Sequence, residues 1–267
     1  MQTKKQMKTE MMLVTPATAK AWLTKNTNNR HMRMDVAHRY ARDMADGRWT
    51  PSHQGIAFYE DGTLADGQHR LFAITVYNKP VKMSVTTNLP RAAGEMIDQH
   101  TPRLAHDAIR IAGGDDWISR DIVALARVLL SKMGTNVHGR SIAEINSFVQ
   151  KYGDALRFAD SLGVNKRRHL TSSKVLANYV CADLAGVPRD TLTRFADIMT
   201  HGEIAGPHEN AAIRLREFLL HTGSPAWMAG ARIETSKKVQ RAISLFAEGK
   251  PVSKLVMPEH LTYPIPE

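Results

Sequence analysis

The turn Asp66, Gly67, Gln68, His69 and Arg70 has the residue types of an anion-binding site. The apolar segment before it predicts a strand, and Gly67 permits a sharp change of direction with close backbone approach. A helix that begins at Gln68 would direct its first-turn N–H groups and the positive end of its dipole toward an anion. His69 and Arg70 could add an imidazole and a planar guanidinium group. Gly67, Gln68, His69 and Arg70 are therefore candidate phosphate-binding residues.

The same turn also has a purely structural interpretation. Asp-Gly commonly begins a helix, with Asp66 in the N-cap position and its carboxylate accepting backbone N–H groups. The turn lacks the Gly-Lys-Ser/Thr of a Walker loop and the later glycines of a dinucleotide-binding fingerprint. A catalytic role would need a group that activates water, and Asp66 and His69 are the candidates for that role.

The segments around the turn predict a small α+β domain. Thr15 followed by Pro16 is typical of a helix start. Alternating apolar residues and Gly-containing turns predict the short strands. We expect helices over residues 16–25, 35–46 and 68–77, and strands over residues 56–59, 63–65 and 81–87.

Two further arginines could reach the same site. Arg30 lies in the polar loop between the first two expected helices, where it could be a second phosphate ligand or an ordinary surface residue. Arg103 could line the cleft together with Asp98 and Asp107, or these three residues could form a structural ion pair and a helix cap. Asp115 and Asp116 are expected to cap the next helix.

The sequence after about residue 104 has helical spacing almost throughout, with glycines between the segments. The expected helices cover residues 104–112, 117–132, 142–150, 154–162, 172–185, 190–200, 209–221 and 227–247. The expected fold is therefore α+β, with a small α/β domain followed by an all-α region. We place a basic, flexible tail at 1–12, the α/β domain at 13–105, the helical domain at 106–257 and an extended tail at 258–267.

The charge balance is compatible with a polyanionic partner, although many basic proteins bind no nucleic acid. The chain has 36 Lys and Arg residues against 26 Asp and Glu residues, so its formal net charge is +10. Basic side chains bind phosphates with release of counterions. Lys166, Arg167 and Arg168 precede an expected helix N-terminus and are candidate DNA-backbone ligands. This cluster could also be a solvated face, as could Lys237, Lys238 and Arg241.

Several classes of protein are excluded by composition. Cys181 is the only cysteine, which excludes a disulfide scaffold and a multi-cysteine metal site. None of the 12 histidines has metal-ligand spacing, so no metal site is expected. No apolar run approaches the roughly 18 residues of a membrane helix. The N-terminus lacks the apolar core of a secretory signal. We therefore expect a cytoplasmic protein that does not enter membranes.

The string Asp66–Leu71, at a strand-to-helix junction, resembles the signature of the ParB/sulfiredoxin-like superfamily. Within that superfamily it is most similar to the ParB-like proteins of phages and mobile elements, described as DGQHR-type. Residues 26–30, 46–49 and 97–103 are also similar to those proteins. The resemblance covers about residues 13–115 and implies a ParB/sulfiredoxin-like fold for that part of the chain.

The resemblance implies a nucleotide or phosphate pocket at the Gly67–Arg70 turn, which would take a nucleotide triphosphate, CTP or ATP, with Mg²⁺. In sulfiredoxin-type members a cysteine precedes the His-Arg pair. Gln68 stands at that position here, so sulfiredoxin activity is excluded. The paired-arginine motif of chromosome-partitioning ParB proteins is not visible in this sequence.

Three hypotheses for the function follow. In the first, the chain is a nucleotide-binding, DNA-associated protein of a phage or mobile element, acting in the host cytoplasm. In the second, the same cleft belongs to a nuclease or an NTP hydrolase that supports DNA modification. In the third, the chain is a non-catalytic interaction protein, such as an inhibitor of a host factor. The sequence leaves the oligomeric state open.

Overall fold

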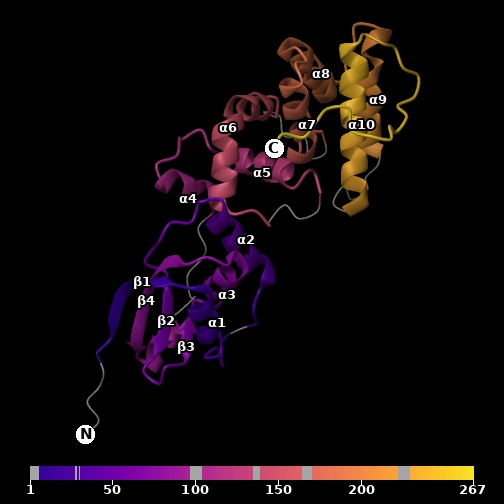
Figure 1. Ribbon diagram of the computed structural model, residues 1–267. Helices are drawn as coiled ribbons and strands as arrows, with labels where there is room; N and C mark the ends of the chain where they lie inside the picture. The colour runs from indigo at the N-terminus through magenta and orange to yellow at the C-terminus, as the bar shows by residue number, and fades with distance from the viewer. Residues whose placement is uncertain are drawn as a thin grey trace. The chain divides into compact units, whose positions relative to one another are not determined.

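The structure, a computed structural model, describes residues 6–27, 29, 31–96, 104–134, 139–163, 170–221 and 229–267. The chain divides into two compact units, Met1–Arg103 and Leu104–Glu267 (Figure 1). The sequence places this boundary close by, after residue 105. The fold is mixed α and β and mostly helical, as the sequence predicts.

The first unit is built on a four-stranded sheet in the order β1-β4-β2-β3. Its strands are β1 (Lys8–Val14), β2 (Ile56–Tyr59), β3 (Leu64–Asp66) and β4 (Val81–Leu89). β4 is antiparallel to β1 and parallel to β2, and β3 is antiparallel to β2. The helices are α1 (Pro16–Leu23), α2 (Met34–Ala45) and α3 (Gln68–Tyr77), and they lie on one side of the sheet (Figure 1). A 3₁₀ helix, η1 (Arg91–Met96), follows β4.

Alternating residues of the strands form the core of this unit. On β4, Val81, Met83 and Val85 are buried against α3, whose Leu71 and Ile74 belong to the same apolar cluster. The side chains between them on β4 point to the opposite face of the sheet, because successive strand residues alternate. The core thus fixes α3 and its N-terminal turn against the sheet.

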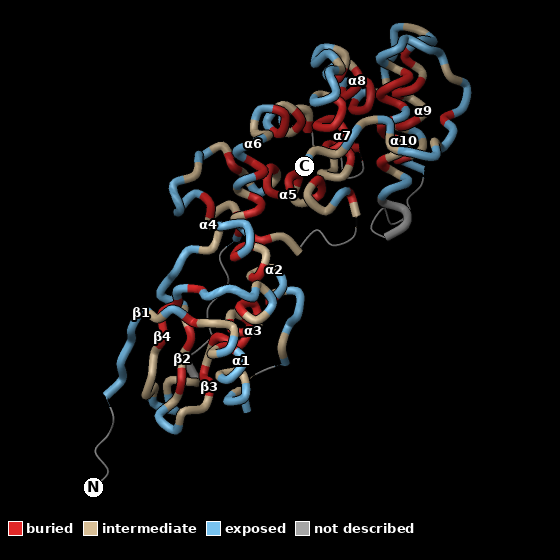
Figure 2. The backbone as a smooth tube through the Cα atoms, in the orientation of Figure 1, coloured by how far each residue is buried: buried red, intermediate tan, exposed pale blue. Residues whose placement is uncertain are grey.

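The prediction of a flexible tail over residues 1–12 is wrong for residues 8–12. These residues belong to β1, which pairs with β4 from Lys8 opposite Thr87 to Val14 opposite Val81. Only the last part of β1 faces the core, and most of the strand is exposed (Figure 2). The strand is held mainly by backbone hydrogen bonds to β4, which the local sequence pattern does not reveal.

The second unit packs its helices around α7. Its elements are α4 (Ala105–Ile111), α5 (Arg120–Leu130), α6 (Ile142–Ser161), α7 (Ser173–Leu184), α8 (Arg189–His201), η2 (Pro207–Glu209), α9 (Asn210–His221) and α10 (Ala229–Ala247). Every residue of α7 from Val175 to Ala182 is buried, with α5, α6 and α10 packed around it (Figure 2). A helix that is buried on all sides is typical of the centre of a bundle.

One local expectation in this unit needs correction. Asp115 and Asp116 do not cap α5: the N-cap is Ser119, whose hydroxyl accepts the N–H of Ile122 at 3.2 Å. Asp115 instead accepts the indole N–H of Trp117 at 3.1 Å. The break expected between the helices at 142–150 and 154–162 is present as a kink at Tyr152, where the backbone of α6 is non-helical.

The segment after α10 is extended and packs on the helical core. The backbone N–H of Tyr263 donates to Gln240 Oε1 of α10 at 2.8 Å. The main-chain oxygen of Glu267 accepts from Tyr152 Oη at 2.7 Å and from Lys151 Nζ at 3.1 Å. Residues 258–267 are therefore extended but attached at both α6 and α10. Among the helices described, none has the length and apolar character needed to cross a membrane.

Candidate functional site

The candidate turn lies between β3 and α3 and depends on two glycines. Gly67 is the N-cap of α3 with a φ of 101°, in the left-handed region that favours glycine. A Cβ at Gly67 would lie 3.0 Å from Ile56 Cα and 3.1 Å from the oxygen of Gly55. A Cβ at Gly55 would lie 1.8 Å from the oxygen of Ser84. Both glycines are thus required for the close approach of β2, β4 and the turn.

Asp66 stabilises the turn from the position directly before Gly67, the N-cap of α3. Its Oδ1 accepts the N–H of Gly67 at 2.6 Å, and its Oδ2 lies 3.5 Å from Arg70 Nη1. The sequence predicts Asp66 itself as the N-cap, whereas the N-cap is Gly67. The carboxylate therefore stabilises the turn and pairs with Arg70.

Gln68 and His69 are buried, and both contact the loop that joins α1 to α2. Gln68 Oε1 accepts from Asn26 Nδ2 at 3.0 Å, near the start of that loop. His69 Nε2 accepts the backbone N–H of Arg33 at 3.0 Å, at the end of the loop. Because Nε2 is the acceptor, this contact requires that Nε2 carry no proton. Two adjacent side chains of the motif thus hold both ends of one loop.

The start of the loop is also tied to β3. Asn29 Nδ2 donates to Asn26 Oδ1 at 2.7 Å and to the oxygen of Leu64 at 2.9 Å. The N–H of Leu64 donates to the oxygen of Lys25 at 2.9 Å. The loop therefore continues the hydrogen bonding of β3 and lies beside the first turn of α3.

Arg70 faces the segment that precedes β2. Its Nη1 donates to the oxygen of Gly55 at 3.1 Å, and its Nη2 donates to Gln54 Oε1 at 3.3 Å. Its side chain is 12% exposed. The Arg70 side chain is therefore largely buried, and its guanidinium group holds the 54–55 segment against the turn.

A second polar cluster, on the β2–β3 hairpin, is not indicated by the sequence. Arg91 of η1 contacts Asp61 and donates to Thr63 Oγ1 at 3.0 Å, with its guanidinium 4.5 Å from the centre of the Tyr59 ring. Hydrogen bonds from Thr63 and Arg91 lower the pKa of Asp61 to about 2. Asp61 therefore stays ionised through the physiological range and holds η1 against the hairpin.

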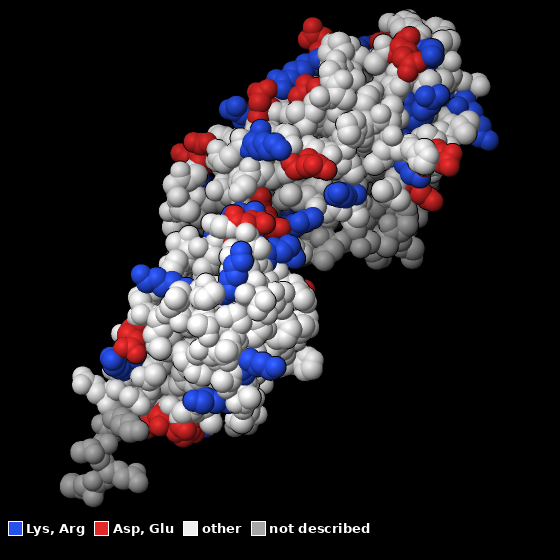
Figure 3. Space-filling view, in the orientation of Figure 1, with Lys and Arg blue, Asp and Glu red and all other residues white. Residues whose placement is uncertain are grey.

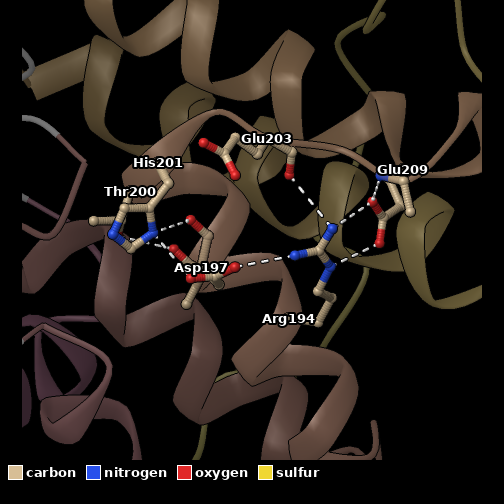
Figure 4. A network of polar contacts seen from close by, with 8 residues as sticks. Arg194, Asp197, Thr200, His201, Glu203 and Glu209 are labelled. Carbon is tan, nitrogen blue, oxygen red and sulfur yellow. Dashed lines mark hydrogen bonds and ion pairs between the residues drawn. The ribbon is translucent and has the colours of Figure 1, made fainter.

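The helical unit has its own polar network, between α8 and α9 (Figure 4). Arg194 donates to both carboxylate oxygens of buried Glu209 at 2.9 Å and to Asp197 Oδ2 at 3.0 Å. Glu209 Oε2 also accepts the N–H of Ala205 at 2.6 Å, and Asp197 Oδ1 lies 2.9 Å from His201 Nδ1. The hydrogen bond from Arg194 lowers the pKa of Glu209. This network fixes the connection between the two helices.

Five of the expected site residues lie outside the residues that the structure describes. They are Arg30, Arg103, Lys166, Arg167 and Arg168. Within the described ranges, no group of three or more His, Cys, Asp or Glu side chains could hold a metal ion. On the face shown in Figure 3, basic side chains are interspersed with acidic ones rather than gathered in one patch.

Comparison with known proteins gives no relative from which to transfer a function: no protein-family model, curated protein or solved structure matches the chain.

Proposed function

We propose that the chain is a ParB-like, DNA-associated protein of a phage or mobile element, and that its α/β unit binds a nucleotide triphosphate at the first turn of α3. One observation carries the proposal: a strand ends directly at a left-handed glycine that opens a helix, and Arg70 lies in that first turn. Helix N-termini at such junctions favour phosphate through their N–H groups and dipole.

The side-chain contacts divide the motif into two kinds of residue. Gly67 and Arg70 are the groups that would touch the phosphates, with Arg70 exchanging the oxygen of Gly55 for a phosphate oxygen. Gln68 and His69 are positioning residues, because they hold the 26–33 loop beside the turn. Mg²⁺ would be held by the phosphate oxygens, since it is commonly bound by substrate phosphates with few protein ligands.

Calorimetric titration of CTP, ATP and GTP with Mg²⁺ tests the nucleotide site. We expect micromolar binding of one nucleotide by the wild type and at least about a tenfold loss in Arg70→Ala, because a charge-assisted contact is removed. Arg91→Ala is the matched control, since Arg91, in η1 of the same unit, contacts the β2–β3 hairpin and not the turn. Absence of binding by the folded wild type, with any of the three nucleotides, would refute the site.

Salt-dependent binding to duplex DNA tests the second part of the proposal. Each phosphate contact contributes a slope of roughly 0.9 in log K against log salt. Replacing Lys166, Arg167 and Arg168 together by Ala should therefore reduce the slope by up to about 3. The same replacement of Lys237, Lys238 and Arg241 is the control. Equal effects of the two triple variants would show that binding is not localised at 166–168.

One observation favours a second candidate, a non-catalytic interaction protein such as an inhibitor of a host factor. The side chains of Asp66, Gln68, His69 and Arg70 all make contacts within the α/β unit. If these side chains serve only to hold the α/β unit together, the turn binds no ligand. These contacts give no support to the nuclease or NTP hydrolase hypothesis, because Asp66 and His69 are engaged as hydrogen-bond acceptors. Binding of a host protein that is unaffected by Arg70→Ala would favour the interaction-protein candidate.

A further inference from the structure

We propose that the chain forms a symmetric dimer in which β1 pairs antiparallel with β1 of a second copy. β1 is the end strand of the sheet, and within the described residues of the first unit it pairs only with β4. In an antiparallel strand every second residue directs its N–H and C=O groups away from the partner. A regular edge of this kind is a template for another strand.

Exposed apolar side chains lie on one face of β1 and of the residue before it. Met7, directly before β1, is 55% exposed, and within the strand Met11 is 49% exposed and Leu13 is 66% exposed. These residues and Thr9 lie on the same face, because alternate strand residues share a face. The edge therefore offers both unused backbone groups and apolar contact area, which a second strand would cover together.

The two charged residues of β1 favour a second copy of β1 as the pairing strand. Lys8 and Glu10 occupy the opposite face, with Lys8 Nζ 2.6 Å from Glu10 Oε2 and side-chain exposures of 67% and 47%. Antiparallel pairing centred on Thr9 places Lys8 opposite Glu10 of the second copy, twice per dimer. Opposite charges in such positions stabilise a pair of strands, and like charges destabilise it.

This charge pattern also selects the register. Centring on Lys8 or on Glu10 would place like charges opposite each other, and centring on Met11 would leave both charges opposite apolar residues. The register centred on Thr9 pairs opposite charges on one face and apolar residues on the other, because it also places Met7 opposite Met11 of the second copy. The two sheets would then form one continuous sheet across the two-fold axis.

Sedimentation over a range of protein concentrations tests the dimer. The contact area of one strand pair is small, so we expect weak association that depends on concentration. Lys8→Glu should weaken dimerisation by about tenfold, because it places like charges opposite each other at two positions. The doubly reversed variant, Lys8→Glu with Glu10→Lys, restores opposite charges and should dimerise like the wild type. Both positions are exposed, so these variants retain the fold.

Disulfide formation tests the register. Thr9→Cys places one cysteine on the two-fold axis, so oxidation should link two chains, whereas the natural Cys181 is buried. Lys82→Cys, an exposed β4 position away from the edge, is the control and should not cross-link. A wild type that remains monomeric at all concentrations would overturn the dimer. More rapid cross-linking of Met11→Cys than of Thr9→Cys would overturn the register.

Discussion

The backbone N–H of Arg33 donates to the Nε2 atom of His69 at 3.0 Å, which joins the start of α2 to the first turn of α3. The two residues lie far apart in the sequence, and the contact requires both a buried imidazole and a defined loop. Gln68 accepts a hydrogen bond from Asn26 at the other end of this loop. Gln68 and His69 together therefore hold both ends of the 26–33 loop.

His69→Ala should release the end of this loop. Removal of a buried hydrogen-bond partner should lower the free energy of unfolding by about 1–3 kcal/mol and speed hydrogen exchange at the Arg33 amide. Hydrogen exchange measured by mass spectrometry would detect both effects. His53→Ala, at an exposed loop position, is the control. Unchanged protection of the Arg33 amide in His69→Ala would contradict the contact.

Gly67→Ala should destabilise the α/β unit more than Gly62→Ala. Both glycines have a positive φ, 101° at Gly67 and 80° at Gly62, so both variants carry backbone strain of about 1–2 kcal/mol. Only at Gly67 does the added Cβ also meet backbone atoms, near Ile56 and Gly55. We expect a total loss of about 3 kcal/mol or more at Gly67. Urea denaturation gives both values, and equal losses would exclude the proposed crowding.

Glu209→Gln should weaken the connection between α8 and α9 in a pH-dependent way. At neutral pH the loss should be about 1–3 kcal/mol, because the amide cannot reproduce the paired carboxylate contacts. Arg194 lowers the pKa of Glu209 in the folded state below its ordinary value of 4.5. The stabilisation is therefore present above pH 4.5 and is lost as the pH falls through the folded-state value.

Thermal denaturation of the wild type and Glu209→Gln from pH 7 to pH 3 measures this difference. The stability gap should narrow on acidification. Glu217→Gln is the control, because its ion pair with Arg214 is exposed and should contribute less than about 0.5 kcal/mol. A gap that stays constant down to pH 3 would show that Glu209 does not titrate as expected.

Cys181 should be inert in the folded protein. Burial raises the pKa of its thiol from 9.0 to about 12. A thiol reagent at pH 8 should therefore react only after denaturation. Because the folded-state pKa is higher than the unfolded value, stability should fall as the pH rises from 9 to 12, by up to about 1.4 kcal/mol per pH unit. The stability of Cys181→Ala should not show this fall between pH 9 and 12. Rapid labelling of Cys181 in the native protein would contradict its burial.

Elements with a strong local signal could be predicted from the sequence. The helix expected over residues 68–77 is α3, because Gly67 opens it and Asn78, in a left-handed conformation, closes it. The strand–turn–helix arrangement of the candidate site could be predicted for the same reason. The break expected at residues 151–153 is present as the kink at Tyr152.

Features that depend on distant partners could not be predicted. The local sequence does not indicate β1, because the strand is ordered by pairing with β4, while Lys8, Thr9 and Glu10 make its first part polar. The partners of Gln68 and His69 come from the loop after α1, so the motif alone did not show whether these side chains face a ligand or the loop. Arg194 of α8 and Glu209 of η2 likewise meet only when the connection between α8 and α9 is folded.

The attachment of Glu267 to Tyr152 has a consequence for the order of folding. The two residues are separated by 115 positions in the sequence. The hydrogen bond between them therefore closes a chain segment that includes most of the helical unit. Closing so long a loop carries a large entropic cost, which is recovered only when the intervening helices have already shortened the distance. The extended segment after α10 should therefore dock late, so that its contacts slow unfolding more than they accelerate folding.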